Sequence, residues 1–161
     1  MKAVVVTGSG GLIGAEAVRY FLGAGYRVLG VDNNMRARFF GREASTEWQI
    51  AELVAQSEYY QHSAMDVRDS EAIRSLFSDN GADIELVIHA AAQPSHDWAS
   101  QDPSTDFAVN ATGTLNLLEA TRCHCPDATF VYTSTNKVYG TAPKWPGPVR
   151  HPPRNTATFI P

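Results

Sequence analysis

The feature that most constrains this sequence is a glycine-rich turn near its N-terminus. Residues 3–7 (AVVVT) are short and β-branched, which is typical of a buried strand, and helical periodicity covers residues 12–24. Between them, Gly8, Gly11 and Gly14 allow a sharp turn, leave room beside the backbone and permit close helix packing. This order of strand, glycine turn and helix predicts that a pyrophosphate binds at the positive N-terminal end of the helix.

A carboxylate follows the next predicted strand, residues 27–31. Asp32 stands at the tip of that strand, about 20 residues after the last glycine of the turn. There it can accept hydrogen bonds from both hydroxyls of an adenosine ribose and repel a 2′-phosphate, which favours NAD over NADP. The positive charges of two nearby arginines, Arg36 and Arg38, reduce this preference for NAD. The alternative is a loop carboxylate that starts a turn with the asparagines after it.

Strand and helix patterns alternate along the rest of the chain. This alternation, with right-handed crossovers, predicts an α/β fold, a Rossmann-like doubly wound parallel sheet of strand order 3-2-1-4-5. We interpret residues 33–44 as a loop with one helical turn, and Thr46 and Gln49 have the spacing of a capping box. The further predicted strands are residues 59–65, 84–89 and 129–133, and the further predicted helices are residues 46–57, 70–80 and 104–124.

The end of the chain differs in composition. Residues 141–161 contain six of the nine prolines, a spacing that no useful helix or strand tolerates. We therefore expect a dinucleotide-binding domain over residues 1–140, an irregular or disordered proline-rich tail over residues 141–161, and no further domain in this chain.

Composition excludes several classes of protein. The net charge of −4 gives no electrostatic reason to expect nucleic acid or an anionic membrane as a partner. No signal peptide is visible and no apolar run reaches transmembrane length, so we expect a cytoplasmic protein. Cys123 and Cys125 flank His124 without further ligands nearby, and we interpret them as reduced thiols rather than as a disulfide or a metal site.

Several stretches together resemble a known family, the extended short-chain dehydrogenase/reductases of the NAD-dependent epimerase/dehydratase group. The general resemblance rests on the glycine turn, Asp32, Asp66 and the strand end at residues 89–92. Within this group the sequence is similar to the CDP-paratose (CDP-tyvelose) 2-epimerases over roughly residues 1–140. The stretches that carry this narrower similarity are residues 32–36, 39–41, 43–46, 93–98 and 134–140.

The resemblance implies an enzyme with tightly held NAD, which takes a hydride from a sugar carbon and returns it to the other face of a keto intermediate. It implies a nucleotide-sugar substrate, with a CDP-sugar favoured, and a possible homodimer through helices that include residues 104–124. By position, the glycines hold the diphosphate, Asp32 and Asn33 the ribose, and Asp66 and Val67 the adenine. The implied cofactor-binding residues are Gly8, Gly11, Leu12, Ile13, Gly14, Asp32, Asn33, Asp66, Val67, Ala90, Ala91, Ala92 and Asn110, and the implied catalytic residue is Thr135.

One departure from the family concerns the catalytic base. The family uses a tyrosine with a lysine four residues later, whose ammonium favours the phenolate. This chain has no Tyr-x-x-x-Lys sequence: Tyr139 is followed four residues later by Pro143, and Lys144 is out of register. The family's substrate domain is also absent from this sequence. We therefore expect a truncated or frameshifted gene product that is inactive alone.

Other interpretations of these residues stay open. Thr135 can cap a turn, Asn110 can bond backbone within its helix, and His89 is better explained as a strand-end residue than as a base. The consecutive residues 95–97 (SHD) cannot form a hydrolase triad, and we interpret them as part of a substrate-facing loop. Three functions remain: part of a nucleotide-sugar epimerase, a non-catalytic NAD-binding or regulatory module, and a nonfunctional fragment that exposes apolar surface.

Overall fold

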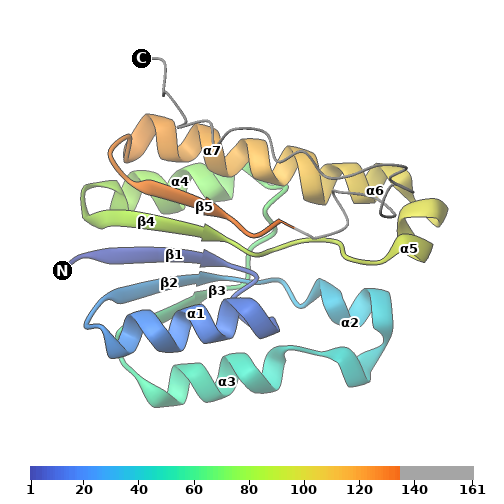
Figure 1. Cartoon of the computed structure of the whole chain (residues 1–161), viewed down its shortest axis with the longest axis horizontal. Helices are drawn as coiled ribbons and strands as arrows, with labels where there is room; N and C mark the ends of the chain where they lie inside the picture. Colours follow the sequence, from blue (N-terminus) through green and yellow to red (C-terminus); the bar gives the residue numbers. More distant parts are fainter. Residues whose placement is uncertain (135–161) are drawn as a thin grey trace, which may run out of the picture.

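The protein forms one parallel sheet with helices on both faces (Figure 1). The computed structural model describes residues 1–134. The strand order is β3-β2-β1-β4-β5, so the predicted Rossmann-like fold and its order are confirmed. The strands are β1 (Ala3–Thr7), β2 (Arg27–Val31), β3 (Tyr60–Ser63), β4 (Ile84–His89) and β5 (Thr129–Tyr132).

The helices divide between the two faces and one edge of the sheet. In Figure 1, α1 and α3 cover one face, α4 and α7 cover the other, and α2 and α5 lie beyond the carboxyl ends of the strands. The helices of the two faces are α1 (Leu12–Gly23), α3 (Glu47–Gln56), α4 (Ser70–Asn80) and α7 (Gly113–His124). The shorter helices and helical turns are α2 (Met35–Phe40), η1 (Arg42–Ala44), η2 (Gly81–Asp83), α5 (His96–Gln101), α6 (Pro103–Phe107) and η3 (Ala108–Thr112).

The central strand β1 is buried on both faces, as its β-branched sequence predicts. Val4 and Val6 pack into the core beneath α1 and α3, whereas Ala3 and Val5 pack into the core beneath α4 and α7. All four side chains are fully buried. This central strand therefore fixes the glycine turn, which begins at Gly8, between two rigid layers.

Two predicted loops contain helices. Residues 35–40 form α2, so the helical part of residues 33–44 is longer than one turn. Residues 96 and 97, which we expected within a loop, begin α5 (His96–Gln101). The Ser95 hydroxyl accepts a hydrogen bond from the backbone N–H of Trp98, 3.3 Å away, and so caps this helix.

The predicted capping box at the start of α3 is wrong. No side chain caps α3 at Thr46, because the Thr46 hydroxyl turns to Asp32 and Asn34 instead, at 3.4 and 3.3 Å. The predicted helix over residues 104–124 exists, but its first part contains the π-helical segment η3. Such segments occur frequently at functional sites.

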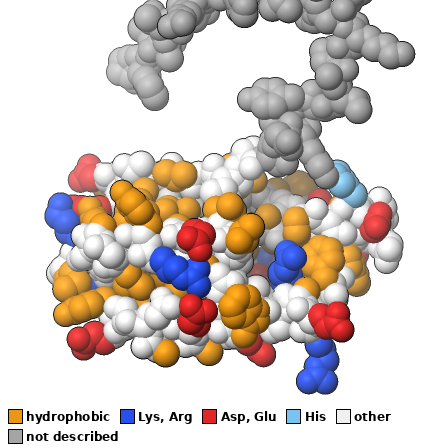
Figure 2. Space-filling model, turned by 60° about the horizontal axis from the view of Figure 1, so that its bottom comes forward, with side chains coloured by type: hydrophobic (Ala, Val, Ile, Leu, Met, Phe, Trp, Pro, Cys, Tyr) orange, Lys and Arg blue, Asp and Glu red, His pale blue; other side chains and the backbone are white. Residues whose placement is uncertain are grey.

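Two predictions fall outside the described residues: the catalytic role of Thr135 and the irregular tail over residues 141–161. Within residues 1–134, no helix is long and apolar enough to cross a membrane. The face formed by α1 and α3 carries scattered hydrophobic side chains among charged ones (Figure 2). Tyr20 in α1 and Trp48 in α3 are both exposed.

Candidate functional site

A cavity of about 310 Å³ opens at the carboxyl edge of the sheet. Every predicted cofactor-binding residue lines it except Asn110. These residues come from three separate strand ends, β1, β2 and β4, and from the segment after β3. The lining residues are Gly8, Gly11, Leu12, Ile13, Gly14, Val31, Asp32, Asn33, Met35, Arg36, Phe39, Phe40, Thr46, Met65, Asp66, Val67, Ala90, Ala91, Ala92, Pro94 and Val109.

The glycine turn forms the floor of this cavity. Gly8 has φ +67°, and a Cβ there would lie 2.8 Å from the backbone nitrogen of Ala91. A Cβ on Gly14 would collide with the carbonyl of Gly8, so the start of α1 packs closely against the turn. The first turn of α1 has neither a capping side chain nor an acidic residue. Its unpaired N–H groups therefore form a positive end suited to an anion.

Asp32 connects the glycine turn to the segment after β2. One carboxylate oxygen accepts a hydrogen bond from the backbone N–H of Gly10 at 3.0 Å, and the other accepts one from Asn34 N–H at 2.8 Å. The alternative turn with the asparagines is thus present, and the same carboxylate also lines the cavity. Asn34 itself has φ +54°, in the left-handed region that asparagine tolerates better than most residues.

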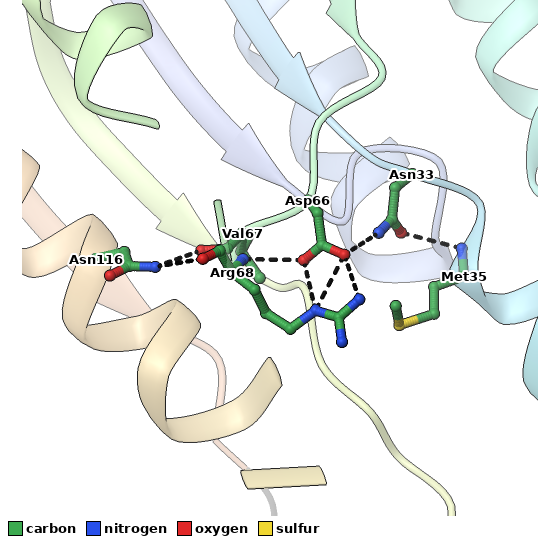
Figure 3. A network of polar contacts seen from close by, with 6 residues as sticks. All are labelled: Asn33, Met35, Asp66, Val67, Arg68 and Asn116. Atoms are coloured by element: carbon green, nitrogen blue, oxygen red, sulfur yellow. Dashed lines mark hydrogen bonds and ion pairs between the residues drawn. The ribbon is translucent and has the colours of Figure 1, made fainter. Parts of the chain in front are cut away.

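Asp66 is held by a fork of hydrogen bonds from Arg68 (Figure 3). The Arg68 guanidinium approaches to 2.6 Å, and the Asn33 amide donates a further bond of 3.0 Å. Burial alone would raise the pKa of Asp66, but the bonds and positive charge of Arg68, together with the bond from Asn33, lower it. The carboxylate that we predicted at the adenine end of the site is therefore ionised and fixed.

Helix α7 holds the neighbouring segment in place. The Asn116 amide donates to the carbonyls of Val67 and Arg68, at 2.9 and 3.2 Å (Figure 3). Gly113 allows this close approach, because a Cβ there would lie 2.6 Å from a methyl group of Val67. No motif in the sequence singled out Asn116, since an asparagine within a helix has no special pattern.

Asn110 is not among the residues that line the cavity. Its side chain accepts from the backbone N–H of Gln93 at 2.9 Å and donates to the carbonyl of the same residue at 3.1 Å. It also donates to Asp106, one turn earlier, at 3.1 Å. The Asn110 side chain therefore forms hydrogen bonds with the backbone of the loop after β4, and not with the backbone of its own helix as the alternative interpretation had it. Asn110 orders that loop, and a direct cofactor contact stays a prediction.

His89 is completely buried and joins three segments. Thr7 and Thr114 hydroxyls contact its two ring nitrogens, at 2.7 and 3.0 Å. Thr7 also accepts a bond from Ala91 N–H, and Thr114 donates one to the Asn110 carbonyl. Burial lowers the pKa of His89 to about 4, so the ring is neutral at pH 7. This arrangement makes His89 a structural connector of the site.

The segment after β2 supplies an apolar wall that sequence reasoning did not assign. Met35, Phe39 and Phe40 line the cavity from α2, and the Arg36 guanidinium lies 5.2 Å from the centre of the Phe40 ring. The adjacent phenylalanines were a visible signal, but without a helical period they could not be placed. Arg36 therefore reaches the cavity, as its position near Asp32 suggested.

Metal ligands and cysteines were the other candidate groups in the described part of the chain. No group of three His, Cys, Asp or Glu residues there is arranged to hold a metal ion. Cys123 is exposed and Cys125 is buried.

The fold and site agree with the sequence comparisons. Residues 4–158 match the NAD dependent epimerase/dehydratase family. The chain belongs to that family.

Two relatives and one solved structure show which members of the family this chain is similar to. The chain is 33% identical over 154 residues to UDP-glucose 4-epimerase of Mus musculus, covering 94% of this chain and 43% of the relative. It is 28% identical over 137 residues to CDP-paratose 2-epimerase of Salmonella typhi, covering 85% of this chain and 38% of that one. The structure resembles UDP-glucose 4-epimerase from Bifidobacterium longum in complex with NAD⁺ and UDP, with a TM-score of 0.70, 27% identity and coverage of 87% and 39%. The chain thus spans about two fifths of the length of these relatives.

Proposed function

We propose that this chain is the NAD-binding portion of a nucleotide-sugar epimerase, with the binding domain in residues 1–140. The observation that carries this proposal is the convergence of the glycine turn, Asp32, and the segments after β3 and β4 on one cavity. Ligands of doubly wound folds bind at this edge of the sheet. Membership of an NAD-dependent family supports the same ligand.

The residues present fit such a dinucleotide. The turn has the tight backbone path of a dinucleotide-binding turn, since Cβ atoms at Gly8 and Gly14 would meet backbone atoms of the chain itself. The N-terminus of α1 supplies N–H donors for the diphosphate, and Asp32 supplies acceptors for the ribose hydroxyls. The small side chains of residues 90–92 leave room for the nicotinamide end. NAD supplies hydride acceptance and return at a sugar carbon when it is bound.

We propose a nucleotide-sugar as the substrate class, with a CDP-sugar favoured. The relatives include enzymes named for UDP-glucose and for CDP-paratose. The resemblance of residues 32–36, 39–41, 43–46, 93–98 and 134–140 supports the CDP-sugar, and parallel assays with both substrates distinguish the two. Thr135, next to the described residues, is the proposed hydroxyl that bonds the reacting sugar oxygen.

A second function, an NAD-binding module without catalysis, is favoured by one observation. The 161 residues contain no tyrosine with a lysine four residues later. Without that pair, the chain has no phenolate to accept the sugar proton, so we propose that it turns over nothing alone.

Pairing of two copies through α7 is a further part of the proposal. Leu115 and Leu118 are exposed on this helix, at 57% and 44%, although both are large and apolar. Light scattering of the purified chain tests this: a mass of twice 17.5 kDa supports pairing, and a single-chain mass contradicts it.

The experiment that tests the proposed function combines binding and turnover. Isothermal titration of the chain with NAD⁺ is expected to show saturable binding. Incubation of the chain and NAD⁺ with UDP-glucose or CDP-paratose is expected to show no epimerised product. Absence of binding would contradict the proposed function, and product formation would contradict the proposed inactivity.

A further inference from the structure

Two short helices from opposite halves of the sheet meet beyond its carboxyl edge. Helix α2 follows β2, whereas α5 follows β4, and Figure 1 shows both on the side to which the strands point. Each helix has only six residues. Helices of this length are not stable alone, so contacts outside the helix must hold each in place.

One such contact joins the two helices. The indole N–H of Trp98 in α5 donates a 2.7 Å hydrogen bond to the backbone carbonyl of Phe39 in α2. The two rings also pack against each other, with centroids 5.3 Å apart and planes inclined by 57°. Phe39 is 9% exposed. The Phe39 carbonyl lies in the last turn of α2, where carbonyl groups have no hydrogen-bond partner within the helix. The indole of Trp98 supplies the missing donor.

This contact bridges the two walls of the cavity. Phe39 lines the cavity from the α2 side, and Pro94, which stands just before α5, lines it from the other side. Trp98 does not line the cavity, but it contacts Phe39, which does.

Each helix is anchored at its start, close to the sheet. Before α2, the Asn34 side chain bonds to Ser45 and to the backbone N–H of Thr46, at 3.0 and 2.9 Å. Before α5, Asn110 bonds to the backbone of Gln93. The contact between Phe39 and Trp98 therefore joins two segments that are already held in place at the residues before each helix.

We propose that the contact between Phe39 and Trp98 is a clasp that retains the bound dinucleotide. Phe39 is the residue that closes over the cavity, and Trp98 is a positioning residue that holds Phe39 there. The inference rests on the proposed function, because it takes the dinucleotide as the ligand of the cavity. Opening the clasp requires breaking the indole hydrogen bond and separating the rings, so the clasp slows both the entry and the escape of the ligand.

Stopped-flow fluorescence of NADH bound to the whole chain tests the clasp. Trp98→Ala removes both contacts, and Trp98→Phe removes the hydrogen bond but keeps a ring. We expect the NADH dissociation rate to rise about tenfold in Trp98→Ala and by a smaller factor in Trp98→Phe, with the association rate rising in the same order. Trp48→Phe is the matched control, because Trp48 is 64% exposed on α3, and its dissociation rate should equal that of the unchanged chain.

The outcomes separate the clasp from the proposed function. Thermal melting without ligand shows whether each variant folds, and Trp98→Phe, the milder change, keeps the test valid if Trp98→Ala does not. If the unchanged chain binds NADH and the folded Trp98 variants release it at the unchanged rate, the clasp is overturned. If the unchanged chain binds neither NAD⁺ nor NADH, the proposed function fails and the clasp fails with it.

Discussion

The phenol of Tyr60 donates a 3.0 Å hydrogen bond to the hydroxyl of Ser9, although 51 positions separate the two residues. Both are buried, at 4% and 0% exposure. The Tyr60 side chain passes over Gly30, where a Cβ would collide with its hydroxyl. Strand β3 thereby supports the glycine turn from beneath. Burial raises the pKa of Tyr60, so the phenol keeps its proton and stays a donor.

Replacing this phenol tests the support of the turn. Tyr60→Phe removes the bond to Ser9 and leaves the serine hydroxyl buried without this donor. We expect the free energy of unfolding to fall by about 1 kcal/mol, measured by urea denaturation. Tyr59→Phe is the control, because Tyr59 is 47% exposed, and its stability should not change. Equal stabilities of all three proteins would contradict the role of the bond.

Two glycines of α1 should respond oppositely to alanine. In Gly14→Ala the new methyl group collides with the Gly8 carbonyl, so we expect a loss of about 3 kcal/mol and loss of NAD⁺ binding. Gly23 has open space around its Cβ position, so Gly23→Ala should gain about 0.5 kcal/mol and bind NAD⁺ normally. Denaturant unfolding and titration calorimetry measure both effects. A Gly14→Ala variant that is as stable as Gly23→Ala would disprove the close contact.

The buried His89 should make stability depend on pH. Its pKa is about 4 in the folded chain and about 6.5 in the unfolded chain, so the unfolded chain binds more protons between these values. The free energy of unfolding contributed by neutral His89 is therefore fully present above about pH 6.5 and decreases by about 3 kcal/mol as pH falls to about 4.

Comparison with a variant isolates this effect from other groups, including His62, whose pKa burial also lowers. His89→Gln removes the titrating ring, so its stability disadvantage relative to the unchanged chain should shrink as pH falls from about 7.5 to about 4.5. Urea denaturation at several pH values measures the difference. A disadvantage that stays constant over this range would exclude a folded pKa near 4.

Asp32 should set the preference between the two nicotinamide coenzymes. Asp32→Ala removes the acceptors for the ribose hydroxyls and the charge that repels a 2′-phosphate, while Arg36 remains in the cavity. We expect NAD⁺ affinity to fall about tenfold and the NADP⁺ to NAD⁺ affinity ratio to rise. Asp79→Ala, at an exposed position on α4, controls for net charge. An unchanged ratio in Asp32→Ala would refute the predicted role.

Much of the fold and cavity could be predicted because local patterns encode them. The strand order followed from alternating strands and helices, and the β-branched run at residues 3–7 identified the central strand. The residues after β1, β2 and β4 meet because parallel strands end at one edge of the sheet. The sequence pattern alone was therefore enough to predict which strand ends lie next to one another, without knowledge of side-chain packing.

The remaining features depend on contacts between distant segments. Helix α5 is only six residues long, and its Trp98 is fixed by a carbonyl in α2 rather than by a local pattern. Thr46 has the spacing of a capping residue, yet Asp32 and Asn34 compete for its hydroxyl. Short helices and polar networks of this kind are decided by tertiary packing, which periodicity does not reveal.

The most direct test of the central claim is a map of backbone amide shifts by two-dimensional NMR as NAD⁺ is added to the chain. We expect saturable shifts at the amides of residues 8–14, 32–33, 66–67 and 90–92, with little change along α4. Shifts confined to another surface, or no shifts at millimolar NAD⁺, would contradict a dinucleotide site at the carboxyl edge of the sheet.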